Sequence, residues 1–334
     1  MGESTWNDPF FAAARTIGDR TIDVGIPGGI RLVAVDLDGV VWLGGSVLPD
    51  APAALTEVVR RGLDLRYVSN NSTAHREAVS ERLAAAGFPA GVGRVFTSGY
   101  VTGQWLRQRL PQGAPVLVVG EPGLMRELAE AGLEPVHAGG ELTVAAAQAP
   151  GAGAPAGAAD AATPAATLGA ARSAAPSGAP FQAVVVGMDR GFDFKMLAQA
   201  QAAVLGGALF VGTNPDRTFP TPAGLLPGAG SVIAAVATAA QKEPTYMGKP
   251  GLGLAEILSK VTGVAPGQTL FIGDRMSTDI GFGIRAGMVT ALVLTGVTTP
   301  AEFERIRAIG GPDMPDHVLR TLADLPQLLD RLGV

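Results

Sequence analysis

Short runs of β-branched and other apolar residues alternate along the chain with longer stretches whose apolar positions recur at helical spacing. Such alternation predicts repeated βα units, and therefore an α/β fold built on a doubly wound parallel sheet. The expected strands are Leu32–Val35, Leu65–Val68, Val116–Val119, Ala183–Val186, Ala208–Val211, Thr269–Ile272 and Thr290–Leu294. The expected helices are Ala51–Arg61, Arg76–Ala86, Val101–Arg109, Gly123–Ala131, Phe194–Leu205, Gly251–Val261 and Ile280–Gly287. Helix ends are indicated by glycines suited to left-handed backbone, at Gly62, Gly87, Gly132 and Gly287.

One segment, Val144–Pro180, lacks this pattern. It contains 18 Ala, 5 Gly and 5 Pro, and its only charged residues are Asp160 and Arg172. Small side chains bury little apolar surface against the cost of ordering the chain, and recurrent Pro and Gly interrupt helices. We therefore interpret the segment as a flexible insertion, with Val144–Ala149 as the main helical exception.

Composition narrows the function classes. The 334 residues carry 25 Lys and Arg against 30 Asp and Glu, a formal net charge of −5, which disfavours nucleic-acid binding as the main function. The absence of cysteine removes disulfides, thiolate nucleophiles and cysteine metal sites. No window reaches the roughly 18 apolar residues of a spanning helix. The first residues include Glu3 and Asp8 and do not resemble a secretory leader, so we expect a cytoplasmic protein without a membrane partner.

Polar side chains stand where predicted strands end, and the carboxyl ends of strands in an open parallel sheet form the ligand crevice. The first strand leads into DLDGVVW, in which Leu37 separates Asp36 from Asp38 and places both carboxylates on one side of an extended turn. The second strand leads into VSNNS, which presents the Ser69 hydroxyl and the Asn70 amide. We expect these four polar groups to meet at one crevice.

Two further carboxylates and a lysine belong to the same predicted crevice. Asp274 and Asp279 follow a later strand in GDRMSTDI, and Lys249 stands in the loop MGKPG. Two unit charges about 4 Å apart repel by about 4 kcal/mol at an effective dielectric constant near 20, so converging carboxylates require a cation. An oxygen-only ligand set with few protein ligands suits Mg²⁺. Together these groups predict a phosphoryl-transfer site.

The two aspartates of the first strand can divide the chemistry. Asp36 can attack phosphorus as a carboxylate nucleophile and form an aspartyl-phosphate. Asp38 can protonate the departing alkoxide and then take a proton from the hydrolytic water.

At this point DLDGVVW, VSNNST, GKP and GDRMSTDI, in that order, resemble the four motifs of the haloacid dehalogenase-like phosphatase superfamily. The stretches VVVGMDRGFDF and GTNPDRTFPTPAGLLPGAGS resemble the cap domain of its NagD-like or p-nitrophenylphosphatase-like branch. The similarity runs from about Leu32 to Thr298. It implies a Mg²⁺-dependent phosphomonoesterase that acts on small phosphate esters, of the sugar or triose phosphate, nucleotide or p-nitrophenyl phosphate type.

The resemblance assigns roles to the core residues. Asp36 corresponds to the nucleophile and Asp38 to the acid/base. Ser69 and Asn70 correspond to the phosphoryl-binding pair, and Lys249 to the residue that balances charge.

The resemblance also implies a metal site. Asp274 joins Asp36 and the Asp38 carbonyl around Mg²⁺. Asp279 lies behind these ligands, where it holds a metal-bound water or orients Arg275.

The implied domain organisation places an inserted cap within a catalytic core. Residues 1–28 form an N-terminal extension, 29–109 and 247–334 form the core, and 110–246 form the α/β cap that contains the insertion at 144–180. Such a cap closes over the crevice, excludes water and selects substrate. The resemblance also suggests a homodimer through the cap.

Residues after two predicted cap strands are the candidates for contact with the leaving group. Arg190 or Arg217 would favour a substrate with a second anionic group. Relatives tuned to pyridoxal phosphate tend to have histidine where Phe219 aligns, which makes that substrate less favoured. The full set of candidates is Met188, Asp189, Arg190, Asn214, Asp216, Arg217 and Phe219.

Three alternatives stay open. A phosphotransferase or phosphomutase would use the same aspartyl-phosphate but pass the group to a sugar hydroxyl. A phospho-accepting signalling module uses similar residues, although it needs only about 120 residues and no cap. A binding protein without activity is disfavoured by the intact motifs.

Several other polar and aromatic residues are expected to have structural roles. Ser72 or Thr73 is expected to cap the helix after VSNNS. His75, His137 and His317 are expected to be surface or cap residues. The aromatic residues expected to serve packing are Trp42, Tyr67 and Trp105.

Overall fold

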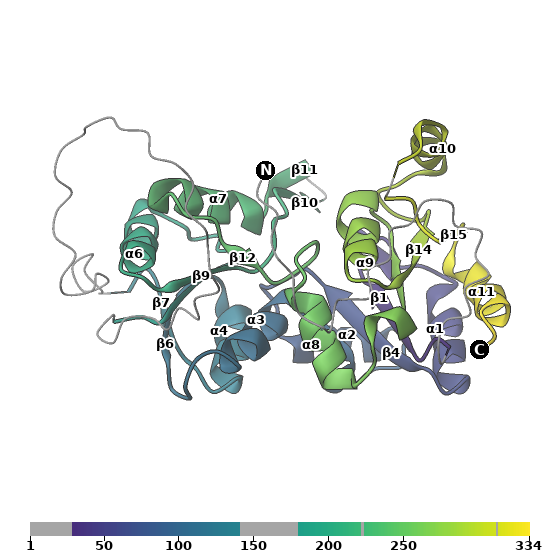
Figure 1. Cartoon of the computed structure of the whole chain (residues 1–334), viewed down its shortest axis with the longest axis horizontal. Helices are drawn as coiled ribbons and strands as arrows, with labels where there is room; N and C mark the ends of the chain where they lie inside the picture. The colour runs from purple at the N-terminus through teal and green to yellow at the C-terminus, as the bar shows by residue number, and fades with distance from the viewer. Residues whose placement is uncertain (1–28, 141–179, 222–223, 312) are drawn as a thin grey trace, which may run out of the picture.

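The computed structural model describes residues 29–140, 180–221, 224–311 and 313–334. The expected N-terminal extension and the expected insertion up to residue 179, including Val144–Ala149, lie outside these residues. Within them the chain forms two parallel sheets in two lobes along the long axis of the molecule (Figure 1), each covered by helices. The predicted α/β fold is confirmed.

The first lobe is built on a six-stranded sheet. Every neighbouring pair in it is parallel. β1 lies inside the sheet between β4 and β13, so the chain leaves it in opposite directions and a crevice opens at its carboxyl end. The strand order is β15 (His317–Leu319), β14 (Val289–Val293), β13 (Thr269–Gly273), β1 (Leu32–Asp36), β4 (Asp64–Ser69) and β5 (Val95–Thr97).

Helices cover both faces of this sheet. Successive side chains of a strand point to opposite faces, so Leu32 and Ala34 of β1 pack in one apolar cluster with α3 and α8, while Val33 and Val35 pack in another with α1 and α11. The helices of this lobe are α1 (Ala51–Arg60), α2 (Arg76–Ala85), α3 (Ser98–Arg107), α8 (Gly253–Thr262), α9 (Gly281–Arg285), α10 (Pro300–Ile309) and α11 (Leu325–Arg331).

The second lobe is a smaller parallel sheet with helices on both sides. An antiparallel hairpin of β10 (Thr218–Thr221) and β11 (Gly224–Pro227) extends from it. Its strand order is β12 (Thr245–Tyr246), β9 (Leu209–Gly212), β8 (Ala183–Val186), β6 (Pro115–Val119) and β7 (Glu134–His137). Its helices are α4 (Pro122–Glu130), α6 (Phe194–Leu205) and α7 (Ala229–Ala240).

The two lobes share a hydrophobic core. Val116 and Val118 of β6 belong to the same cluster as Leu32 of β1, through α3, α4 and α8. Figure 1 shows α3 and α8 between the two sheets. Gly103 of α3 permits close packing, because a Cβ atom there would lie 3.0 Å from the carbonyl oxygen of Glu127 in α4. The second lobe is therefore packed against the first along a broad face.

Each expected strand and helix lies within three residues of an observed one, but the strands β5, β7, β12 and β15 and the hairpin of β10 and β11 were not expected. The four glycines expected at helix ends all have positive φ, between +72° and +83°. The expected helix at Ile280–Gly287 is present as α9, and a π-helical turn at Met276–Ile280 precedes it. One expectation was wrong, because α2 is capped by His75, whose ring accepts a hydrogen bond from the Glu77 N–H, rather than by Ser72 or Thr73.

No helix among residues 29–140, 180–221, 224–311 and 313–334 is long and apolar enough to cross a membrane.

Candidate active site

A cavity of about 700 Å³ lies at the carboxyl ends of β1 and β4 and is lined by residues of both lobes. Asp189 and Arg217 do not line it, so the structure does not bring these two predicted residues to the site. Asp279 lies behind the lining, fully buried. The predicted residues that do line the cavity are Asp36, Asp38, Ser69, Asn70, Lys249, Asp274, Met188, Arg190, Asn214, Asp216 and Phe219.

Three carboxylates and one ammonium group form the centre of this site. Asp36 ends β1, and Asp274 and Asp279 follow β13. Each of the three offers an oxygen, and these oxygens lie within 4.8 Å of one another. Lys249 Nζ lies 2.8 Å from Asp36 Oδ1 and 2.7 Å from Asp279 Oδ1. One ammonium thus balances one of three buried carboxylates.

Asp279 is fully engaged by the protein. Its Oδ1 accepts from Lys249, and its Oδ2 accepts from the backbone N–H groups of Asp274 and Arg275, at 3.2 and 3.0 Å. The π-helical turn brings this carboxylate back beneath the end of β13. Asp279 therefore orients Lys249 and the turn that carries Asp274.

Asp274 has one oxygen held and one without a partner. Its Oδ2 accepts from the Val297 N–H at 2.6 Å. Its Oδ1 is buried and has no hydrogen-bond partner among the described residues. Close packing surrounds the carboxylate, because a Cβ atom would lie 2.3 Å from Oδ2 at Gly39 and 2.0 Å from it at Gly296. Glycine at both positions keeps room for the carboxylate.

The electrostatics of this cluster favour a cation. Burial raises the pKa of Asp36 well above its usual range, against the lowering effect of Lys249, and Asp279 and Asp274 add to the increase. Burial and Asp279 raise the pKa of Asp274 to about 6. Burial lowers the pKa of Lys249, but Asp279 and Asp36 outweigh it, and the net shift is upward. Oxygen ligands, excess negative charge and a free Asp274 oxygen together suit a divalent cation such as Mg²⁺.

Asp38 reaches the cavity from a turn that is closed by a contact with Trp42. The side chain of Asp38 is exposed, and its Oδ1 accepts from the indole Nε1–H of Trp42 at 2.9 Å. Trp42 begins a short hairpin of β2 (Trp42–Leu43) and β3 (Ser46–Val47) and is 4% exposed. Its role is therefore more than packing. The DLDGVVW spacing contained this signal, since a tryptophan four residues after Asp38 folds back across the turn.

Ser69 is the last residue of β4, and Asn70 follows it. Ser69 Oγ accepts from the Asn71 N–H at 3.1 Å, which leaves its hydroxyl proton free to donate. Asn70 Nδ2 donates to the Lys249 carbonyl at 2.8 Å and to Asp216 Oδ2 at 3.0 Å. The Asn70 side chain therefore connects the loop that carries Lys249 with the second lobe.

The second lobe holds this loop from above. Asn214 Nδ2 donates to the Asn70 carbonyl at 2.7 Å, and Asn214 is 4% exposed. Arg190 forms an ion pair with Glu121, in which the single nitrogen Nη1 lies 2.6 and 2.8 Å from the two carboxylate oxygens. Asp189 Oδ2 pairs with His137 Nε2 at 2.9 Å, and its Oδ1 accepts from the Gly191 N–H at 2.8 Å. The charge expected to select anionic substrates at Arg190 is thus already balanced.

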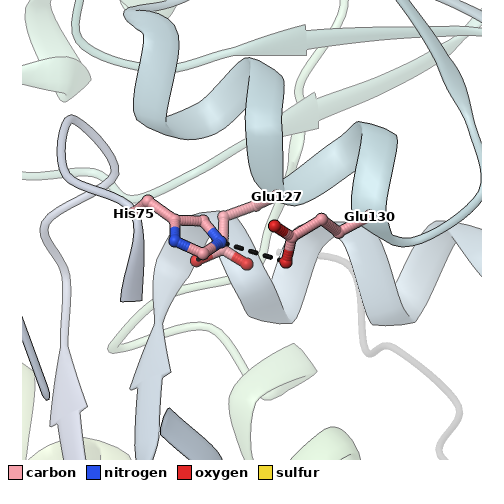
Figure 2. A group of neighbouring side chains, drawn as sticks. All are labelled: His75, Glu127 and Glu130. Atoms are coloured by element: carbon pink, nitrogen blue, oxygen red, sulfur yellow. Dashed lines mark hydrogen bonds and ion pairs between the residues drawn. The ribbon is translucent and has the colours of Figure 1, made fainter. Parts of the chain in front are cut away.

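A second cluster of metal-ligand residue types lies where α2 and α4 meet (Figure 2). His75 Nε2 lies 3.1 Å from Glu130 Oε2, and Glu127 Oε1 accepts from the Arg76 N–H at 2.8 Å. Arg76 and Arg126 also lie 3.6 and 2.9 Å from Glu127 and Glu130 carboxylate oxygens. Because these arginines balance the carboxylates, the cluster is a joint between the lobes. His75, expected at the surface or in the cap, is 8% exposed.

Comparison with known proteins identifies the class to which this site belongs. A family model described as haloacid dehalogenase-like hydrolase matches residues 33–134, and one described as HAD-hydrolase-like matches residues 246–325. Glycerol-3-phosphate phosphatase of Gallus gallus is 37% identical over 303 residues, which cover 88% of this chain and 90% of the relative.

Solved structures agree with the sequence matches. The p-nitrophenyl phosphatase from Archaeoglobus fulgidus has a TM-score of 0.73 at 27% identity, covering 90% of this chain and 99% of that one. Glycerol phosphate phosphatase from Mycobacterium tuberculosis, solved in complex with magnesium, has a TM-score of 0.69 at 29% identity, covering 90% and 78%. NagD from Escherichia coli has a TM-score of 0.68 at 25% identity, covering 89% and 98%.

The chain belongs to the haloacid dehalogenase-like hydrolases, in their NagD-like branch. It is a phosphoric monoester hydrolase that acts on small phosphate esters. The resemblance found in the four sequence motifs is confirmed.

Proposed function

We propose that the protein is a Mg²⁺-dependent phosphomonoesterase that works through an aspartyl-phosphate, with Asp36 as nucleophile and Asp38 as acid/base. The observation that carries the proposal is the placement of Asp36 at the end of β1, in contact with Lys249 and beside Asp38 in one cavity. A carboxylate so placed can attack, and its neighbour can move the proton.

The reaction divides into two displacements at phosphorus. In the first, a carboxylate oxygen of Asp36 bonds to phosphorus, the bond from phosphorus to the ester oxygen breaks, and Asp38 gives its proton to the departing alkoxide. In the second, Asp38 takes a proton from water while that water attacks phosphorus. The bond to Asp36 breaks, inorganic phosphate leaves and both aspartates return to their starting states.

The residues around Asp36 would bind the phosphoryl oxygens. The Ser69 hydroxyl and the Lys249 ammonium converge on the end of β1 from two loops. Both side-chain N–H groups of Asn70 already bond to Asp216 and the Lys249 carbonyl, so this side chain would hold the two loops in place. Donors fixed in place before the reaction stabilise developing negative charge without reorganisation. The bonds from Asn70 to Lys249 and Asp216 and the ion pairs of Lys249 supply that rigidity.

The metal ligands in this proposal are Asp36, the backbone carbonyl of Asp38, and Asp274. The buried Asp274 Oδ1, which has no hydrogen-bond partner among the described residues, supports the assignment. Asp279 contributes indirectly, through Lys249 and the turn that carries Asp274. When bound, Mg²⁺ neutralises charge on the phosphoryl group and on the carboxylates.

We further propose that residues 29–109 and 247–334 are the catalytic core and that 110–246 are the cap. The cap residues Asn214, Asp216 and Phe219 face the cavity and would contact the leaving group. Relatives named glycerol-3-phosphate phosphatase and dihydroxyacetone phosphatase support a sugar or triose phosphate substrate. Dimerisation through the cap is proposed on the family resemblance alone.

The test is the initial rate of phosphate release from sugar, glycerol, glycolate, nucleotide, pyridoxal and p-nitrophenyl phosphates, with Mg²⁺ and with EDTA. Mg²⁺-dependent release with water as the sole acceptor supports the proposal. Release that requires a sugar acceptor would instead identify a phosphotransferase, and release unaffected by EDTA would contradict the metal assignment.

Asp36→Asn tests the nucleophile. The amide keeps the shape of the side chain but cannot attack phosphorus, so we expect kcat to fall by at least about 10³-fold while the melting temperature changes little. Steady-state kinetics and thermal unfolding by circular dichroism measure both. Retention of most of the activity would overturn the aspartyl-phosphate mechanism.

A further inference from the structure

Two of the arginines that line the cavity, Arg82 and Arg275, form no ion pair among the described residues, and of these two Arg82 stacks on Trp42. Three arginines line the cavity: Arg82, Arg190 and Arg275. Arg190 is paired with Glu121, and Arg275 lies next to Asp274, whose pKa its charge lowers. Arg82, in α2, forms no ion pair within the described part of the chain, and its side chain is exposed. An unpaired guanidinium in an anion-binding cavity is available to a ligand.

Two contacts fix the position of Arg82. Its guanidinium carbon lies 3.9 Å from the centre of the Trp42 ring, and its Nη2 donates to the Gly45 carbonyl at 3.4 Å. Stacking on a buried indole holds one face of the guanidinium. The remaining N–H donors, at the edge of the plane, keep their ability to bind a carboxylate or phosphate.

Trp42 contacts both Arg82 and Asp38. The same indole that carries Arg82 on its face donates its N–H to Asp38, the proposed acid/base. Asp38 must lie beside the ester oxygen of the substrate to protonate it. A leaving group that extends from that oxygen along Trp42 therefore reaches Arg82.

We propose that Arg82 is a specificity-determining residue that binds an anionic group on the leaving group of the substrate. This inference rests on the proposed function and narrows it: esters whose alcohol part carries a carboxylate or a second phosphate are favoured over neutral ones. Arg82 takes the role that the sequence had suggested for Arg190 or Arg217, because Arg190 is paired and Arg217 does not line the cavity.

A matched pair of substrates tests the proposal. Phosphoglycolate has a leaving group with a carboxylate, and glycerol 3-phosphate has one with hydroxyls only. In Arg82→Gln we expect the ratio of kcat/KM for phosphoglycolate to that for glycerol 3-phosphate to fall about ten-fold, mainly through the KM of phosphoglycolate, because a charge-assisted contact is lost. Fructose 1,6-bisphosphate against fructose 6-phosphate repeats the comparison for a second phosphate.

Arg190→Gln is the control, since it removes an equal charge from the same cavity and should leave the ratio within about three-fold of the wild-type value. An unchanged ratio in Arg82→Gln, or an equal fall in both variants, would overturn the role of Arg82 while leaving the phosphatase intact. If the wild-type protein hydrolyses none of these esters, the proposed function fails, and the role of Arg82 fails with it.

Discussion

Trp42 packs in the core and also forms a hydrogen bond with Asp38. The indole of Trp42 is 4% exposed and packs in the apolar cluster beneath the sheet, yet its one polar atom donates to Asp38. A tryptophan N–H that is otherwise buried requires a partner, and the carboxylate supplies it. The same bond limits the directions in which Asp38 can present its proton.

Trp42→Phe keeps the buried ring and removes this N–H. We expect kcat for glycerol 3-phosphate to fall about ten-fold, because the acid is less well oriented toward an alkoxide that needs a proton. For p-nitrophenyl phosphate the fall should be smaller, since nitrophenolate leaves without protonation. Steady-state kinetics on both substrates measure the difference. Trp105→Phe is the matched control, because Trp105 also carries a stacked arginine, Arg109, at 3.7 Å; an equal effect of both variants would contradict a role for the N–H.

Gly39 has two reasons to lack a side chain. Its φ is +86°, and a Cβ atom would lie 2.3 Å from Asp274 Oδ2. In Gly39→Ala we expect kcat/KM to fall by at least about 10²-fold and Mg²⁺ affinity to weaken, because Asp274 must move. Gly62→Ala has a similar φ, +79°, but nothing within 4 Å of the Cβ, so it should lose about 1 kcal/mol of stability and keep its activity. Kinetics and calorimetric Mg²⁺ titration test this, and identical behaviour of the two variants would exclude the steric argument.

Whole elements position these residues through strand order and chain reversal. β1 is flanked by β4 and β13, which explains why Asp36, Ser69 and Asp274 meet although 238 positions separate the first from the last. The π-helical turn after β13 then folds Asp279 back under the strand end. Because the carboxyl ends of parallel strands lie at the same edge of the sheet, segments that are far apart in the sequence become neighbours there.

The edge strand β15 gives the protein a pH-dependent contribution to stability. Burial lowers the pKa of His317, with Arg331 in the same direction and Asp316 opposing, and its Nε2 is buried without a partner among the described residues. The unfolded chain therefore binds a proton more readily than the folded one. This contribution is complete above the ordinary histidine pKa near 6.5 and is lost as the pH falls through that value toward the lower folded pKa.

In His317→Asn this contribution is absent. We expect the unfolding free energy of the wild-type protein to fall more steeply than that of the variant as the pH decreases from about 7 to 5. Urea denaturation at several pH values measures both curves. Parallel curves would show that His317 titrates alike in the folded and unfolded states.

At the scale of the molecule, the two lobes are joined by more than the two chain crossings. The apolar cluster that contains Leu32 also contains Leu124 and Leu128 of α4. Beside it, Glu127 of α4 accepts from the backbone of Arg76 at the start of α2. The loop with Ser69 and Asn70 leads directly into this joint, so the second lobe supports these two residues.

Glu127→Ala tests the joint. Glu127 is 2% exposed, and its loss leaves the backbone N–H of Arg76 without its acceptor and the Arg76 guanidinium without its ion-pair partner. We therefore expect unfolding to become easier by about 2–3 kcal/mol. Glu130→Ala, whose carboxylate side chain is 41% exposed, should cost less than about 1 kcal/mol. Chemical denaturation of both variants measures the difference. Equal losses of unfolding free energy in the two variants would mean that the buried contact of Glu127 stabilises the protein no more than the exposed contact of Glu130.

Sequence patterns predicted the central strands and most of the helices, together with the residues proposed to form the site. Strand and helix periodicities are local, as are the turns that present Asp36, Asp38, Ser69 and Asn70, so the motifs could be interpreted without a fold. The alternation of short apolar runs with helical stretches also indicated that the sheet is parallel. These properties depend on neighbours a few residues away, which the chain order supplies directly.

Which charged groups have partners depends on the packing of distant segments. Arg190 is paired with Glu121, which lies 69 positions earlier in the chain, so its charge is balanced. His75 is buried because α4 packs against it. Arg82 gained its place in the cavity from stacking on Trp42. Pairing between side chains depends on distances that exist only after the lobes pack, and no local periodicity encodes them. The partners of each charge were therefore a property of the folded molecule.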